Sequence, residues 1–150
     1  MSEQSVTKER KQPRFNHVGL SLPADLMDDA GRKEIVDFYN DVFGWNEIDI
    51  LTIDRKRLVL QCYSVDQFVF IHAEDDPLKA PRLDHFGIRV FEMDELDAMV
   101  ARAKKWAERD DRVDLIDKKA DDQGVVVITS FYVKFILPLM VEIQHWEWAK

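Results

Sequence analysis

The sequence has 150 residues, of which 46% are hydrophobic and 33% charged, a composition that fits one globular domain and excludes a disordered chain. The formal net charge of −8 argues against a nucleic-acid-binding protein, because phosphate recognition requires a concentrated basic surface. No run of residues approaches the roughly 18 consecutive apolar residues of a membrane span, so we expect neither nucleic-acid nor membrane partners.

The N-terminal residues 1–14 are polar and partly basic, and we expect them to form a flexible arm. They contain no apolar stretch of the kind found in signal peptides. Cys62 is the only cysteine, which excludes an intrachain disulfide and gives no sign of an oxidising compartment. We therefore expect a cytoplasmic protein.

A single domain is predicted over residues 15–150, and its first module is expected at 15–73. This module begins with a strand at residues 15–22. A helix follows at 32–43, because apolar residues recur there at helical spacing and Gly44 acts as a stop. Three strands are then predicted at residues 45–53, 57–63 and 67–73, with short polar turns between them.

Residues 74–82 contain two prolines and are predicted to connect this module to a second one at 83–150. The second module repeats the order, with a strand at 83–90, a helix at 94–109 and strands at 112–117, 124–135 and 139–146. The sequence therefore predicts an α+β fold of two tandem βαβββ modules, whose mixed sheets form a pair of curled half-barrels around a central cleft.

One short motif occurs at the start of both modules: Asn-His-Val-Gly-Leu at 16–20 returns as Asp-His-Phe-Gly-Ile at 84–88. Because side chains alternate along a strand, His17 and Gly19 share one face, as do His85 and Gly87. Two equivalent imidazoles directed into one cleft indicate a metal site built by a duplicated half-barrel. The alternative is that each histidine is only a packed strand residue.

These motifs, together with Phe-Tyr-Asn-Asp-Val-Phe-Gly-Trp at 38–45 and Val-Glu-Ile-Gln at 141–144, give the sequence its resemblance to a known superfamily. It resembles the vicinal-oxygen-chelate proteins, which include glyoxalase I, bleomycin-resistance proteins, fosfomycin-modifying thiol transferases and type I extradiol dioxygenases. The resemblance extends from Phe15 to Trp148.

The resemblance implies a divalent metal ion, iron, manganese or zinc, held by side chains from the first and last strands of the modules. The matching positions are His17, His85 and Glu142. At the fourth position, where glyoxalase I has a carboxylate, this sequence has Phe70. Three ligands on one side of a cation would leave positions open for water, oxygen or substrate.

Two residues are candidates for proton transfer. Tyr132 precedes Glu142 by ten residues, a spacing similar to the Tyr-to-Glu segment of extradiol dioxygenases, in which a tyrosine hydroxyl leans over the metal-bound substrate. His72 is expected on the cleft face of its strand, where it would serve as a general acid or base or as a replacement metal ligand. The alternatives are core packing for Tyr132 and a solvent-exposed strand end for His72.

Three further residues are expected to contact the substrate. Phe70 adds to an apolar, aromatic lining, Gln144 lies on the same strand face as Glu142, and Arg89 is the one cation on the face of His85. This lining favours a small aromatic or apolar molecule that chelates the metal through oxygen. The tryptophans at 106, 146 and 148 contribute a large apolar surface, which a homodimer would cover.

The sequence therefore favours a metal-dependent enzyme of this superfamily, with dioxygenase chemistry ahead of glyoxalase- or epimerase-type proton transfer. One alternative is a metal-free binding protein of the bleomycin-resistance type. The other is a fosfomycin-type thiol transferase, for which Arg89 would be the only evident cation.

Overall fold

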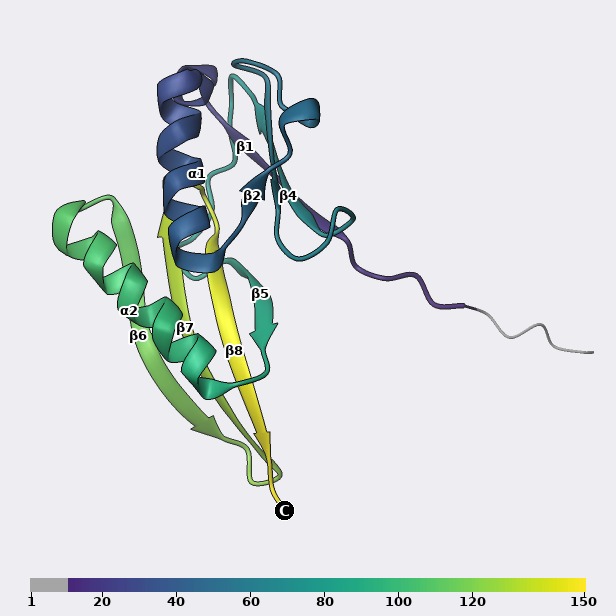
Figure 1. The fold of residues 1–150 in the computed structure, drawn as a ribbon, viewed down its shortest axis with the longest axis vertical. Coiled ribbons are helices and arrows are strands. Elements are labelled where there is room, and N and C mark those ends of the chain that lie inside the picture. The colour runs from purple at the N-terminus through teal and green to yellow at the C-terminus, as the bar shows by residue number, and fades with distance from the viewer. Residues whose placement is uncertain (1–10) are drawn as a thin grey trace, which may run out of the picture.

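The computed structural model describes residues 11–150 and contains two four-stranded mixed sheets and two long helices (Figure 1). The first sheet has the order β1-β4-β3-β2 and comprises β1 (His17–Leu22), β2 (Asn46–Glu47), β3 (Arg57–Gln61) and β4 (Phe68–Ala73). The second has the order β5-β8-β7-β6 and comprises β5 (His85–Val90), β6 (Val113–Asp122), β7 (Val126–Phe135) and β8 (Met140–Trp148). The helices are α1 (Asp29–Phe43) and α2 (Met93–Arg109), with short 3-10 helices at Ala24–Met27 and Asp49–Leu51.

The predicted α+β fold with two βαβββ modules is confirmed, and neither sheet closes into a barrel. In each module the first strand pairs in parallel with the last one, β1 with β4 and β5 with β8. The first strand thereby becomes an edge of its sheet. Of the predicted N-terminal arm, residues 1–10 lie outside the described residues. Within residues 11–150, neither helix has the length and apolar character needed to cross a membrane.

The first helix starts earlier than predicted, at Asp29 instead of residue 32, because the Asp28 carboxylate accepts a hydrogen bond from the Gly31 backbone N–H at 2.8 Å. Its predicted apolar face is buried (Ile35, Phe38, Tyr39, Val42). The helix ends at Gly44, which has a φ of 77°. A left-handed residue of this kind closes the last turn and favours glycine.

The strand predicted at residues 45–53 is wrong over most of its length. Only Asn46 and Glu47 pair with β3, and a 3-10 helix follows at Asp49–Leu51. In this helix the Leu51 N–H donates to the Ile48 carbonyl, and Ile50 is 91% exposed. The alternation in this segment therefore has no sheet face to pack against.

The second helix packs on β5–β8 through Leu96, Val100 and Ala103. Its first turn is closed by a capping box between Glu92 and Glu95. The following strand, β6, runs to Asp122 and not to the predicted residue 117. A register shift between Ile116 and Lys119 lets its exposed, charged half continue pairing with β7.

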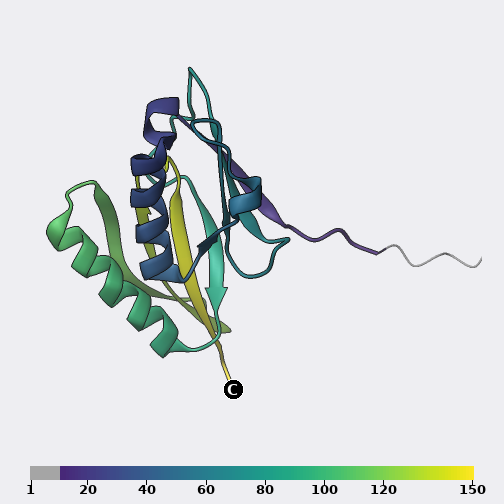
Figure 2. The same ribbon diagram turned by 45° about the horizontal axis from the view of Figure 1, so that its top comes forward.

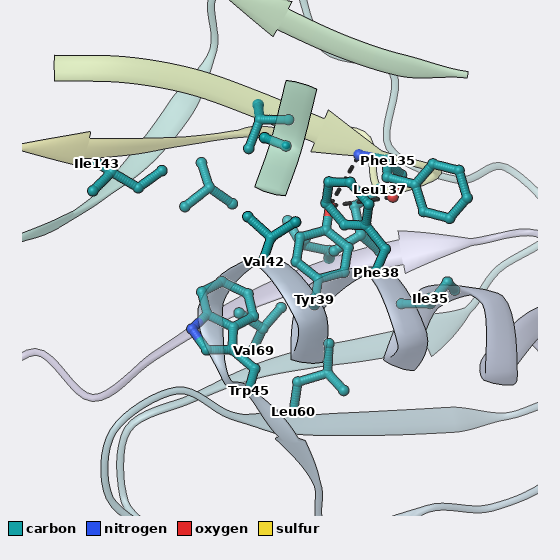
Figure 3. Close-up of a cluster of buried hydrophobic side chains, with 14 of the residues drawn as sticks. Ile35, Phe38, Tyr39, Val42, Trp45, Leu60, Val69, Phe135, Leu137 and Ile143 are labelled. Atoms are coloured by element: carbon teal, nitrogen blue, oxygen red, sulfur yellow. Dashed lines mark hydrogen bonds between the residues drawn. The ribbon is translucent and has the colours of Figure 1, made fainter. Parts of the chain in front are cut away.

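Both helices lie on one side of the molecule, and α1 reaches from its own sheet across to β7 (Figures 1 and 2). The Tyr39 hydroxyl of α1 donates to the Phe135 carbonyl and accepts from the Phe135 N–H, both at 3.2 Å (Figure 3). Beside it the Phe38 ring packs on Phe135 and Trp106. One hydrophobic core therefore serves both modules, and their other faces remain open.

Candidate metal centre

The two repeated histidines use the same ring nitrogen for a local hydrogen bond. His17 Nδ1 lies 2.7 Å from the side-chain oxygen of Asn16, and His85 Nδ1 lies 2.7 Å from the Leu83 carbonyl oxygen. Because these oxygens accept, the proton is on Nδ1 in both rings. Each Nε2 then carries the lone pair, as a metal-binding imidazole requires.

His85, Glu142 and Tyr132 meet on the open face of the second sheet, away from the helices. His85 Nε2 lies 3.2 Å from one carboxylate oxygen of Glu142, and the Tyr132 hydroxyl donates to the other at 2.8 Å. The rings of His85 and Tyr132 meet edge to face, with centroids 5.2 Å apart. Three residues predicted as site residues therefore form one cluster.

Strand register explains this convergence. Tyr132 of β7 lies directly opposite Glu142 of β8, and Gly87 of β5 lies on the other side of Glu142. A Cβ atom at Gly87 would stand 3.8 Å from the carboxylate. The glycine therefore leaves the carboxylate uncovered on the side of β5, although Glu142 as a whole is 6% exposed.

The environment keeps Glu142 ionised and Tyr132 protonated. Burial by itself would raise the pKa of Glu142, but hydrogen bonds from the polar side chains of Gln144, Tyr132 and Ser130 outweigh it and lower the pKa. Burial, followed by the contact with Glu142, raises the pKa of the Tyr132 phenol. Tyr132 is consequently a hydrogen-bond donor near neutral pH and not a base.

The donor pair fits a divalent cation. Two ligand atoms, each about 2.1 Å from a shared cation, lie about 3.0 Å apart at a right angle and about 3.4 Å apart at the tetrahedral angle. The 3.2 Å between His85 Nε2 and the Glu142 oxygen falls within this interval. His85 donates from Nδ1 to the Leu83 carbonyl and Glu142 accepts from the Tyr132 hydroxyl, and these two hydrogen bonds hold the ligand atoms in this orientation.

His17 is not part of this cluster within one chain. Among residues 11–150, no group of three or more His, Cys, Asp or Glu side chains is arranged to hold a metal ion. The His17 ring instead stacks on Phe68 of β4, with centroids 4.9 Å apart and planes 6° from parallel. Phe70, at the position where glyoxalase I has a carboxylate, is two residues further along β4, opposite Gly19.

The other predicted site residues lie further along the same faces. His72 contacts Glu74, with Nε2 3.5 Å from a carboxylate oxygen, while its buried Nδ1 has no partner within the described chain. Gln144 accepts a hydrogen bond from the Trp146 indole at 2.8 Å. The Arg89 guanidinium lies over the rings of Trp146 and Phe91, at 5.6 and 5.2 Å. The predicted roles of these residues in proton transfer and substrate binding stay predictions.

A cavity of about 580 Å³ lies between the edge strands β1 and β5, and Arg89, expected at the central cleft, is among the residues that line it. We call it the inter-module slot. Residues of β1, β4, β5 and both helices line it, among them His17, Phe68, Gly87 and Arg89 from the open faces and Trp45 and Phe86 from the core. Alternation along single strands carries no signal for a cavity between two modules.

No protein-family model matches the chain, and no curated protein matches it in sequence. Solved structures do match. Lactoylglutathione lyase from Agrobacterium tumefaciens superposes with a TM-score of 0.61 at 16% identity, covering 91% of this chain and 96% of the lyase. A glyoxalase/bleomycin resistance protein/dioxygenase from Alicyclobacillus acidocaldarius gives 0.60 at 17% identity, covering 91% and 95%. The fold implied by the resemblance is thereby confirmed, because the chain shares the fold of these glyoxalase-type structures over most of their length.

Proposed function

We propose that this chain is a divalent-metal-dependent enzyme in which His17, His85 and Glu142 hold the metal ion. The observation that carries the proposal is the cluster on the second sheet, where Glu142 lies 3.2 Å from His85 and 2.8 Å from Tyr132. Two imidazoles and one carboxylate suit iron(II), manganese(II) or zinc(II). When bound, such an ion supplies Lewis acidity that stabilises developing negative charge on a chelating substrate.

The residues of the chain prepare the site in three ways. The Leu83 carbonyl fixes the tautomer of His85, so that the lone pair of Nε2 is available to a metal ion. Tyr132 donates to one oxygen of Glu142 and leaves the other oxygen toward His85. Since the phenol of Tyr132 remains protonated and has a single O–H, it would donate to an anionic substrate oxygen only in place of Glu142. This arrangement favours a dioxygenase-like reaction on a small aromatic or apolar substrate over glyoxalase- or epimerase-type proton transfer.

We further propose that the third ligand, His17, comes from a second copy of the chain. His17 is exposed on an edge strand, and the described chain brings no third ligand to the His85–Glu142 pair. A symmetric homodimer would place the first module of each copy against the second module of the other. With one unpaired cysteine, the protein would work in a reducing compartment such as the cytoplasm.

Metal content, measured by elemental analysis on protein purified without a metal-binding tag, tests the proposal. We expect about one iron, manganese or zinc ion per chain. His17→Ala, His85→Ala and Glu142→Gln should each lose the ion. His145→Ala is the matched control and should retain the ion. His145 is on the helix-facing side of β8, opposite the face that carries Glu142. Protein that takes up no metal even after reloading under reducing conditions would instead be a metal-free binding protein of the bleomycin-resistance type.

A further inference from the structure

The inter-module slot differs from the proposed metal site in position and in chemistry. Neither His85, Glu142 nor Tyr132 lines it, and only His17 among the proposed ligands reaches it. Its volume of about 580 Å³ lies within the range of small-molecule sites. The slot is therefore large enough to hold a ligand of its own.

The inner wall of the slot is apolar and held rigidly by aromatic packing. Trp45, which is 2% exposed, stacks between Tyr39 and Phe86, with ring centroids 5.3 and 6.3 Å away. Phe43 packs on the same indole at 5.0 Å, and Met99 of α2 also lines the slot. Because these rings cover Trp45, the half-buried Phe43 and Phe86 are the ring surfaces that a flat apolar group would meet without a large rearrangement.

The mouth of the slot is also aromatic. Phe15, Tyr63 and Phe91 all line the slot, and each is more than 70% exposed. Exposed apolar side chains gathered around a concave surface are typical of a binding site. The ligand chemistry indicated by both wall and mouth is an aromatic ring system.

The charge of the slot is positive although the protein is acidic. The chain has 29 Asp and Glu residues, yet among residues 11–150 no Asp or Glu lines the slot, and Arg89 is the only Lys or Arg of this described part that does. Within residues 11–150, Arg89 has no carboxylate partner, and the rings of Phe91 and Trp146 hold its guanidinium. A planar guanidinium in this position suits a carboxylate.

From these contacts we propose that the inter-module slot binds an aromatic carboxylate, with the ring system against the wall formed by Phe43 and Phe86 and the carboxylate on Arg89. This site deepens the proposed function, on which it rests for Arg89 as a substrate-binding residue, but binding itself does not require the metal. Gln67 and Asn16, which also line the slot, provide neutral polar groups for a second substituent.

The test uses 2-naphthoate and its neutral isostere 2-naphthamide, titrated against the full chain after metal removal with a chelator. Quenching of tryptophan fluorescence and calorimetry report binding. We expect saturable binding of naphthoate at about 1 mM or below, and binding of the amide about fivefold weaker. In Arg89→Gln this preference for the carboxylate should disappear. The control Lys105→Gln, which removes one exposed cation of α2 outside the slot, should keep it.

The location of the probe is tested through Cys62, whose side chain lines the slot. Saturating naphthoate should slow modification of Cys62 by a maleimide at least about fivefold, in proportion to the occupied fraction. This measurement needs no substitution and is independent of whether a variant folds.

Three results would overturn the proposal: no binding of naphthoate, a carboxylate preference that survives in Arg89→Gln, or binding that leaves Cys62 unprotected. Metal content is a separate measurement, so failure of this proposal and failure of the proposed enzyme function are distinguishable.

Discussion

Tyr132 and Glu142 are directly opposite each other on β7 and β8, and the tyrosine hydroxyl donates to the carboxylate at 2.8 Å. This contact orients the proposed metal ligand without blocking its second oxygen. Replacing Tyr132 by Phe should lower metal affinity about 10- to 100-fold, the range found when a ligand loses the group that orients it. Competition with a chromophoric chelator measures this affinity.

Tyr63→Phe is the control for that substitution, because Tyr63 is exposed at the mouth of the inter-module slot and makes no contact with Glu142. Unchanged metal affinity in Tyr132→Phe would show that the hydroxyl does not orient the ligand.

The position of His17 can be tested by mixing two inactive chains. His17→Ala and Glu142→Gln should each bind no metal alone. If the site is shared between copies, a heterodimer of the two variants regains one intact site. After unfolding and refolding of an equal mixture, about one quarter of the wild-type metal content should return, because random pairing makes half of the dimers mixed. Zero recovery would place all three ligands within one chain.

Cys62 should react slowly for a physical reason. Burial raises the pKa of its thiol to about 12. The reactive thiolate is therefore scarce at pH 8, and alkylation by iodoacetamide should be about 100- to 1,000-fold slower in the folded protein than in the chain unfolded in urea. Mass spectrometry of timed samples gives both rates. Equal rates would mean that the segment around Cys62 opens readily.

The connector between the modules is held to β6 by Arg82, whose guanidinium donates to both carboxylate oxygens of Asp114. The hydrogen bond from Arg82 lowers the pKa of Asp114. A lowered carboxyl pKa stabilises the folded state above the pKa of the unfolded chain, near 4, and this contribution is lost as the pH falls through the folded-state value.

Arg82→Gln should therefore reduce stability at pH 7 only slightly, since the pair is partly exposed, and should have no effect below pH 3 or so. Urea unfolding at both pH values measures the difference. Lys79→Gln, an exposed residue of the same connector, is the control. A difference between Arg82→Gln and wild type that persists in acid would assign the effect to packing of the arginine stem.

Gly44 ends α1 with a φ of 77°, and a Cβ atom there would meet nothing within 4 Å. The cost of Gly44→Ala is therefore conformational and should be about 1 kcal/mol of unfolding free energy. Gly19→Ala, where an added Cβ also meets nothing but φ is not positive, should be nearly neutral. Equal losses in the two variants would show that something other than backbone conformation decides the effect.

The sequence carries much of this fold because apolar residues alternate or recur with clear periods. The face of α1 that buries Ile35 and Phe38 follows from such a period, whereas Glu142 and Tyr132 are expected at a site only because the sequence resembles a known superfamily. Residues 45–53 do not follow their periodicity, since Ile50 fits the alternating pattern of a strand yet lies in a 3-10 helix. Hydrogen bonds between neighbouring residues, which leave no periodic mark, decided that segment.

The placement of His17 relative to Glu142 is a different kind of problem. Each residue lies on the open face of its own sheet, as its strand pattern implies, but no local pattern specifies how two modules meet. That geometry depends on contacts such as Tyr39 with Phe135, which are 96 residues apart in the chain. The size and lining of the inter-module slot depend on the same packing, so the sequence did not predict them.

The contact of the Tyr39 hydroxyl with Phe135 also determines whether the two modules can fold as separate fragments. A single buried group of the first module satisfies both the N–H and the carbonyl of Phe135 in the second. If the chain is divided within the connector at residues 74–82, the two fragments should therefore be insoluble when each is expressed alone. Produced together, the fragments should reassemble, because each fragment completes the interior of the other.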